Sequence, residues 1–291
     1  EMFRPLLFET IRAETAYCYR CPRSAEAPPC AVCAGEEIER LILERADETA
    51  AVIVEPRVQG AAGIIVQPEG FLRRVREACT RADVLLIADE VATGFGRTGR
   101  MFACNHEGVA PNLLCIAKGL TGGYLPLAAT LATEEIFDAF RGAPGEGRTF
   151  FHGHSYTGNP LGCAAALASL GIFEAEGTLD ALQPKIRRFW SELARLRDLP
   201  AVGEVRGLGF MAGIELVADR ETKAPFSEDQ KIHERLNERF KKYGMILRMT
   251  GPIISIGPPI CITPAEVDEI VHALDLSLWE VEGELGVAQT A

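Results

Sequence analysis

Three short apolar runs constrain the fold of this chain more than any other feature. They are residues 52–54, 84–88 and 113–117. A continuous apolar run is typical of a strand covered on both faces, as in parallel sheets. Between the first two runs, residues 71–81 carry apolar side chains at helical spacing, which completes a strand–helix–strand unit. The pattern predicts an α/β fold, with a mainly parallel sheet and flanking helices.

The pattern changes in the last 40% or so of the chain, where charged amphipathic helices are predicted over residues 182–196 and 229–243. Glycine-punctuated strands lie around them. We therefore expect a partial large domain over residues 1–175 and a smaller C-terminal α+β domain over residues 176–291. Just before this boundary, residues 161–173 are apolar nearly all round, which predicts a buried helix.

The composition excludes several classes of function. Hydrophobic residues make up 47% and charged residues 24%, as in soluble globular proteins. Thirty Lys and Arg against 41 Asp and Glu give a net charge of −11, which disfavours a nucleic-acid partner. No apolar run is long enough to span a membrane, and no signal peptide precedes the first strand. We expect a cytoplasmic protein whose partners are small molecules.

Ionisable side chains at the ends of two predicted strands suggest the chemistry. Asp89 and Glu90 follow one apolar run, and Lys118, with Gly119 after it, follows the next. Ligands of α/β sheets gather at the carboxyl ends of parallel strands. A lysine and a carboxylate there suit pyridoxal phosphate, because the lysine can form a Schiff base and the carboxylate can keep the ring nitrogen protonated. Spacing alone leaves open an aspartate that caps a turn and a surface lysine.

The glycine pattern of residues 94–99 matches the dinucleotide fingerprint G-x-G-x-x-G. A true fingerprint needs a helix that opens at its third glycine, so that the pyrophosphate meets the helix N-terminus. Residues 101–112 contain Gly108 and Pro111 and show no helical stripe. The sequence therefore predicts a loop that passes close to the site.

Three motifs in order resemble those of class III pyridoxal-phosphate aminotransferases. They are Ile-Ala-Asp-Glu-Val-Ala-Thr-Gly-Phe-Gly-Arg-Thr-Gly at 87–99, Ala-Lys-Gly at 117–119 and His-Gly-His-Ser-Tyr-Thr-Gly-Asn-Pro-Leu at 152–161. The resemblance implies a fold-type-I transferase, pyridoxal 5'-phosphate as cofactor, a keto acid and an amino donor as substrates, and a homodimer. Within the class it is greatest for the biotin-synthesis branch, supported by residues 121–128. That branch implies transamination of 7-keto-8-aminopelargonate with S-adenosylmethionine as donor.

The resemblance also implies roles for single residues. Asp89 would hold the pyridine nitrogen, Lys118 would be the catalytic Schiff-base lysine, and Val91 would pack against the ring. Ser155, at a position where Thr is common in the family, would bind the cofactor phosphate of the neighbouring subunit with its hydroxyl and amide. His154 would add a backbone contact.

Two further residues concern the substrate. Gly153 would border it, and Arg248 would grip the keto-acid carboxylate through its planar guanidinium. An ω-amino-acid or 4-aminobutyrate aminotransferase that shares the cofactor site remains an alternative.

One departure from the family concerns the N-terminal side. Family members carry an N-terminal part with a Gly-Ser loop for the phosphate, a stacked aromatic residue and part of the substrate pocket, and none of it is found here. We therefore expect a piece of a longer reading frame, of doubtful activity alone, with a poorly covered sheet and an exposed apolar face.

Four cysteines cluster in a proline-rich loop predicted over residues 15–35. Cys18, Cys21, Cys30 and Cys33 form two C-x-x-C pairs, the pattern of a structural four-thiolate zinc site. Reduced loop cysteines or a redox-dependent pair are the alternatives, and no catalytic metal is expected. The alternative hypothesis outside the enzyme class is a non-catalytic interaction module built on this cluster.

Overall fold

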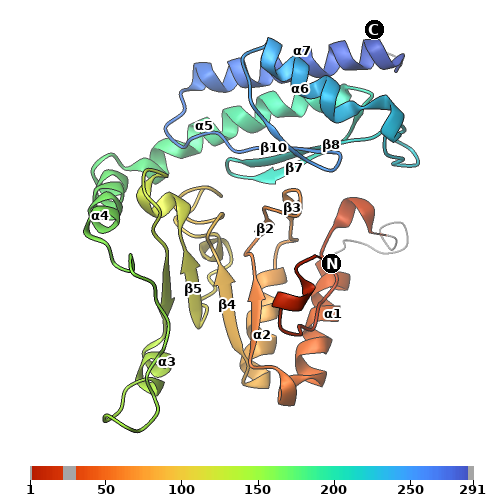
Figure 1. Ribbon diagram of the computed structural model, residues 1–291. Helices are drawn as coiled ribbons and strands as arrows, with labels where there is room; N and C mark the ends of the chain where they lie inside the picture. The colour runs from red at the N-terminus through yellow and green to blue at the C-terminus, as the bar shows by residue number, and fades with distance from the viewer. Residues whose placement is uncertain (1, 22–30, 288–291) are drawn as a thin grey trace.

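The computed structural model describes residues 2–21 and 31–287, apart from the side chains of 31–34. Its first sheet has the order β1-β4-β5-β6. The first three of these strands are parallel, and β6 is antiparallel to β5. This arrangement confirms the predicted α/β fold class (Figure 1). The four strands are β1 (Ala51–Val54), β4 (Leu85–Asp89), β5 (Leu113–Ile116) and β6 (Ala129–Ala132).

Two helices lie side by side against this sheet, α1 (Ala31–Glu44) and α2 (Phe71–Ala82) (Figure 1). Helix α2 buries side chains three and four positions apart, among them Leu72 and Val75, against the alternate β4 residues Leu86 and Ala88. A short hairpin leaves the sheet after β1, made of β2 (Val58–Gln59) and β3 (Ile65–Val66).

The second sheet is antiparallel, with the order β7-β8-β10-β9. Three helices cover one of its faces, and the opposite face looks toward the β2–β3 hairpin (Figure 1). The core between helices and sheet is the largest of the molecule and contains Phe189, Phe210 and Phe240. The elements are α5 (Thr178–Leu193), β7 (Val202–Leu208), β8 (Met211–Leu216), α6 (Ile232–Lys242), β9 (Arg248–Thr250), β10 (Ile253–Ile256) and α7 (Pro264–Leu285).

Helix α7 illustrates how the sequence sets helix ends. Thr263 and Glu266 form a capping box at its N-terminus, and Pro264 occupies the first helical position. Gly286 ends the helix with φ of +66°, a left-handed conformation that glycine adopts without strain. None of the described helices is long and apolar enough to cross a membrane.

The prediction of a buried helix over 161–173 is wrong. Helix α4 (Pro160–Ala175) forms there, but only Gly162 and Ala166 are buried. Helix α4 packs against the turn after β5 and against α5, and its Phe173 contacts Phe95, but Leu161, Leu167, Leu170 and Ile172 are exposed. All four residues of β6 are also exposed, and α3 (Glu134–Ala139) has no buried residue. The expected exposed apolar face is therefore present on these elements.

The cysteine-rich segment differs in part from its prediction. Residues 18–20 form a short 3-10 helix, η2 (Cys18–Arg20), and α1 already begins at residue 31, inside the predicted loop. Cys30 and the side chain of Cys33 lie outside the described residues. The four-thiolate zinc site therefore stays a prediction, as does the domain boundary at residue 175.

Candidate active site

Asp89 and Lys118 lie at the same edge of the first sheet. Asp89 is the last residue of β4 and is opposite Cys115 in the parallel register of β5. The backbone amide of Glu90 donates to the carbonyl of Cys115 at 2.9 Å, so the two strands stay paired to their ends. Lys118 follows two residues after β5 ends. Both groups therefore stand at the carboxyl edge where α/β sheets bind ligands.

Glu55 is a third ionisable group of this cluster and is not among the site residues predicted from the sequence. It follows β1 directly, and Val54 is opposite Ala88 in the parallel register. Burial raises the pKa of Glu55 above its ordinary value; the Gly60 amide and the Lys118 ammonium lower it, and the Asp89 carboxylate raises it. Glu55 is thus within electrostatic range of both Asp89 and Lys118. The signal was present, because Glu55 follows its apolar run as Asp89 follows the next.

Short backbone contacts hold Glu55 in place. Its Oε2 accepts a hydrogen bond from the Gly60 amide at 2.9 Å, and its carbonyl accepts one from Nε2 of the buried Gln67 at 2.9 Å. Oε1 of Gln67 in turn accepts from the amide of Arg57 at 2.8 Å. Arg57 has φ of +64°, an uncommon conformation for a residue other than glycine. One buried amide side chain therefore fixes the turn that presents Glu55.

The backbone of Lys118 is strained. Its φ is +45°, in the left-handed region, and the short 3-10 helix η5 (Lys118–Thr121) begins there. A Cβ atom at Gly119 would lie 2.7 Å from Cβ of Phe95, so the chain after the lysine packs directly on the 94–99 loop. Such strain persists only where the surroundings enforce it, and it is common at functional sites.

The 94–99 loop contacts segments that border the second sheet: the amide of Phe210, between β7 and β8, donates to the carbonyl of Arg97 at 2.9 Å. Arg97 donates through Nη1 to the carbonyl of Pro258, which lies between β10 and α7. Burial lowers the pKa of Arg97. The loop leads into the short 3-10 helix η4 (Ala103–His106) and opens no α-helix, which agrees with the prediction of a loop at the site. A dinucleotide site would need the N-terminus of an α-helix at the end of this loop.

The structure places the other predicted residues in three locations. Val91 lies beside Asp89, and its amide donates to Oδ1 of Asp89 at 3.1 Å. Gly153, His154 and Ser155 lie on an exposed segment before α4, where the amide of His154 donates to Oγ1 of Thr157 at 3.0 Å. Arg248 is exposed at the start of β9, in the second sheet. Within residues 2–21 and 31–287, no hydrogen bond or ion pair joins Arg248 or the 153–155 segment to Asp89 or Lys118.

The residues at the sheet edge fit the group that the resemblance implies. A pyridine nitrogen needs an anionic acceptor, and the carboxylate of Asp89 uses only Oδ1 for a hydrogen bond among the described residues. A carbonyl cofactor needs an accessible amine, and Lys118 is exposed. The described residues contain no group of three or more His, Cys, Asp or Glu side chains that could hold a metal ion.

Comparisons with known proteins identify similar sequences and structures. Residues 2–278 match the family described as "Aminotransferase class-III". Adenosylmethionine-8-amino-7-oxononanoate aminotransferase of Nitratidesulfovibrio vulgaris is 52% identical over 273 residues, which are 94% of this chain and 50% of that protein. The putrescine–pyruvate aminotransferase of Pseudomonas aeruginosa is 37% identical over 82% of this chain and 52% of its own length.

Among solved structures, the adenosylmethionine-8-amino-7-oxononanoate aminotransferase of Methanocaldococcus jannaschii superposes with a TM-score of 0.88 at 44% identity. The match covers 96% of this chain and 62% of that one. The chain thus spans about half to three-fifths of the length of the relatives it matches.

Proposed function

This chain belongs to the class-III aminotransferase family, and on that premise we propose that it binds pyridoxal phosphate and acts in an aminotransferase of biotin biosynthesis. The reaction is transfer of an amino group from S-adenosylmethionine to 7-keto-8-aminopelargonate, which gives 7,8-diaminopelargonate. The observation that carries the proposal is that Asp89 and Lys118 lie at one sheet edge, at the carboxyl ends of the adjacent parallel strands β4 and β5. The names of the similar relatives support the choice of substrates. A cytoplasmic location is part of the same proposal.

Asp89 and Lys118 take the two central roles. When bound, pyridoxal phosphate supplies an aldehyde for covalent attachment and a ring that accepts electrons from the substrate. Asp89 would hold the proton on the ring nitrogen through Oδ2, which has no hydrogen bond among the described residues. The Nζ of Lys118 would hold the cofactor at its aldehyde, and the same amine would move the proton at the substrate carbon. Val91 packs against the ring.

The remaining residues bind the phosphate and the substrate. We assign the hydroxyl and amide of Ser155, with a backbone contact from His154, to the cofactor phosphate of a neighbouring copy, which requires a homodimer. Their exposure on the segment before α4 leaves them accessible to such a neighbour. Gly153 borders the substrate. Arg248 binds the keto-acid carboxylate, a role that suits the two parallel N–H donors of a guanidinium.

The test is to trap pyridoxal phosphate on the protein. The chain is incubated with pyridoxal phosphate, reduced with borohydride and digested, and the modified lysine is identified by mass spectrometry. We expect one principal adduct, on Lys118. The Lys118→Ala variant should lose it, whereas Lys241→Ala, which removes an exposed lysine of α6, should keep it. Trapping on other lysines at equal yield in both variants would overturn the assignment.

A second candidate is an ω-amine aminotransferase with the same cofactor site. The similarity to a putrescine–pyruvate aminotransferase favours it. The enzyme that carries this chain should be assayed with S-adenosylmethionine, putrescine, alanine and 4-aminobutyrate as donors. Amino transfer from S-adenosylmethionine alone supports biotin synthesis, and transfer from the other amines alone supports the second candidate.

A further inference from the structure

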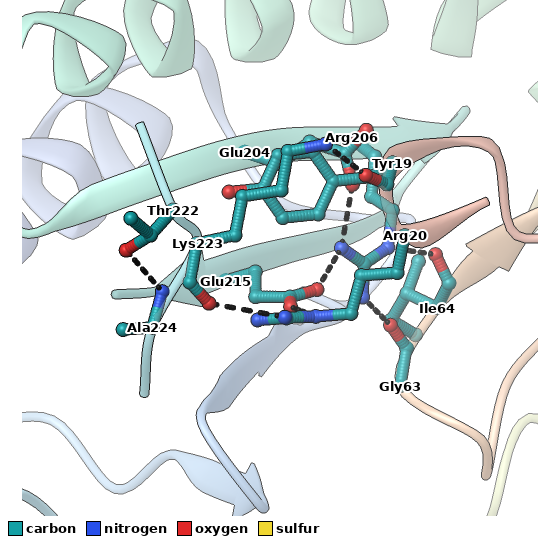
Figure 2. A network of polar contacts seen from close by, with 10 residues as sticks. All are labelled: Tyr19, Arg20, Gly63, Ile64, Glu204, Arg206, Glu215, Thr222, Lys223 and Ala224. Carbon is teal, nitrogen blue, oxygen red and sulfur yellow. Dashed lines mark hydrogen bonds and ion pairs between the residues drawn. The ribbon is translucent and has the colours of Figure 1, made fainter. Parts of the chain in front are cut away.

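A polar cluster joins four segments that are distant in sequence (Figure 2). They are the N-terminal segment that contains η2, the turn of the β2–β3 hairpin, the β7–β8 pair and the segment after β8 that contains Lys223. We call it the Arg206 cluster. Its members are Tyr19, Arg20, Gly63, Ile64, Glu204, Arg206, Glu215 and Lys223.

Arg206 lies at the centre of the cluster and is only 8% exposed. Its Nη1 donates to Oε2 of Glu215 at 2.6 Å and to Oε2 of Glu204 at 2.7 Å. Its Nε donates to the carbonyl of Ile64 at 3.0 Å, and its Nη2 donates to the carbonyl of Gly63 at 2.7 Å. One guanidinium therefore pairs with carboxylates of the second sheet and with two successive carbonyls of the hairpin turn.

The N-terminal segment stabilises Arg206 from the other side. Oε1 of Glu215, whose side chain is 1% exposed, accepts a hydrogen bond from Nε of Arg20 at 2.5 Å. The Arg206 guanidinium lies 4.8 Å from the ring centroid of Tyr17. Lys223 donates to the carbonyl of Tyr19. Glu215 is thus shared by two arginines from different parts of the chain, and Arg206 is held on both sides.

The hairpin turn that Arg206 contacts is strained and closely packed. Gly63 has φ of +106° and Ile64 has φ of +56°, a conformation that is a genuine outlier for a β-branched residue. A Cβ at Gly63 would lie 2.4 Å from Cδ1 of Ile253 on β10. A Cβ at Gly213 on β8 would lie 3.2 Å from the Gly63 carbonyl oxygen. This turn therefore presses directly on the second sheet, and its strain needs partners such as Arg206 to persist.

The hairpin also reaches the cofactor site. The hairpin turn begins at Gly60, whose amide donates to Oε2 of Glu55 at 2.9 Å. Glu55 is within electrostatic range of Asp89 and Lys118. On the opposite side, β8 pairs with β10, and β10 pairs with β9, which begins at Arg248. Arg206 therefore contacts both the hairpin that leads to Glu55 and the sheet that carries Arg248.

We propose that Arg206, held by Glu215 and Arg20, is a positioning residue that fixes the β2–β3 turn against the second sheet. Through that turn it sets the place of Glu55, and through the sheet it sets the place of Arg248 relative to Lys118. The link to Arg248 as a substrate-binding residue rests on the proposed function. The fixing of the hairpin does not.

The experiment compares Arg206→Lys with Arg188→Lys. The first change keeps the charge but removes the fork that spans two carbonyls. The second alters an exposed ion pair between α5 and α7, with Asp268, and serves as the matched control. Hydrogen exchange is read at Gly63 and Ile64, whose amides donate to the Gly60 carbonyl at 3.2 and 3.3 Å, and at β4 as internal reference.

We expect Arg206→Lys to speed exchange at the turn by about tenfold or more while β4 is unchanged, and Arg188→Lys to change neither. Equal protection of the turn in Arg206→Lys and wild type would overturn the proposal. If Arg206→Lys does not fold, Glu215→Gln, which keeps an acceptor but removes the charge, should give the same local effect to a smaller degree. Unchanged exchange at the turn in Glu215→Gln would also overturn the proposal.

Kinetics then separate this inference from the proposed function. In the enzyme that carries the chain, Arg206→Lys should raise KM for the keto acid by about tenfold with little change in the donor half-reaction. Faster exchange at the turn without a KM effect would overturn the link to Arg248. Failure of the proposed function would instead show as loss of the Lys118 adduct in wild-type protein, with the exchange result intact.

Discussion

The buried carboxylate of Glu90 accepts a hydrogen bond from the backbone amide of Cys104 at 2.8 Å, and so ties the end of β4 to the far side of the following loop. The amide of Ala103 donates to the same carboxylate at 2.8 Å, and Oγ1 of Thr93 donates to it at 2.7 Å. Asp89 and Val91 flank Glu90 in sequence. The fully buried acid therefore fixes the backbone on which the proposed ring-nitrogen partner stands.

Glu90→Ala should therefore destabilise the protein strongly. It leaves two buried amides without acceptors, each at about 1–3 kcal/mol, so the free energy of unfolding should fall by roughly 2–6 kcal/mol. Denaturant unfolding measures the change. Glu174→Ala, at an exposed position of α4, is the control and should stay within about 0.5 kcal/mol of wild type. A loss below about 1 kcal/mol for Glu90→Ala would contradict this role.

Gly119→Ala should disturb the turn that carries Lys118. The added Cβ would lie 2.7 Å from Cβ of Phe95, so either the 94–99 loop or the lysine backbone must move. We expect a loss of about 1–3 kcal/mol in unfolding free energy and less pyridoxal phosphate trapped on Lys118. The matched control is Gly171→Ala in α4, where a Cβ meets nothing within 4 Å. That change should stabilise by about 0.5–1 kcal/mol, and equal behaviour of the two variants would count against the close packing at Gly119.

Arg248→Gln should separate the two substrates. If its guanidinium binds the keto-acid carboxylate, KM for the keto acid should rise by about tenfold to a hundredfold, while the donor half-reaction keeps its rate. Single-turnover kinetics of each half-reaction in the enzyme that carries this chain make the comparison. Arg187→Gln, at an exposed position of α5, is the control. Equal damage to both half-reactions would exclude the carboxylate role.

The sheet edge could be predicted from sequence because its signal is local. An apolar run followed by an ionisable residue placed Asp89 and Lys118 correctly at strand ends, and the parallel order brought the strands together. The same rule applies to Glu55, which follows the first run, but its contact with Gln67 could not be predicted, because the intervening hairpin is too short to show a strand pattern.

Features that depend on distant contacts could not be predicted in this way. Arg206 bonds to a carbonyl 142 positions away in sequence, and Arg20 pairs with a glutamate 195 positions away. The hydrophobic periodicity of one segment does not indicate which distant residue pairs with it. The prediction for α4 failed for a related reason: an apolar helix shows that its surface needs a cover, but its own sequence does not show whether the described chain supplies one.

Cysteine reactivity should follow burial. Burial raises the pKa of Cys104 and of Cys79, and Glu90 raises that of Cys104 further, so neither thiol provides a nucleophilic thiolate near neutral pH. Cys18 and Cys261 are exposed. Brief treatment with iodoacetamide, followed by peptide mass spectrometry, should label the exposed pair and spare the buried pair. Labelling in denaturant is the control, in which all four should react. Modification of Cys104 in the folded protein would show that the loop beside Glu90 opens readily.

Glu282 should make the free energy of unfolding of the protein depend on pH. It is buried on α7; its Oε1 accepts from the amide of Ala201 at 2.7 Å, and its Oε2 has no partner among the described residues. Burial raises its pKa above the ordinary 4.5, although the Ala201 amide opposes the shift. A raised folded-state pKa gives a contribution that is complete below the unfolded-state pKa and is lost as the pH rises through the folded-state value.

Glu282→Gln removes this ionisation. The free energy of unfolding of the variant, minus that of wild type, should therefore increase as the pH rises from about 4 to about 8. Urea unfolding at several pH values measures the difference, with Glu269→Gln, an exposed position of the same helix, as the control for a surface substitution. A difference in unfolding free energy that is constant or that decreases with pH would contradict this prediction. It would show that a partner stabilises the charged carboxylate of Glu282 in the folded protein.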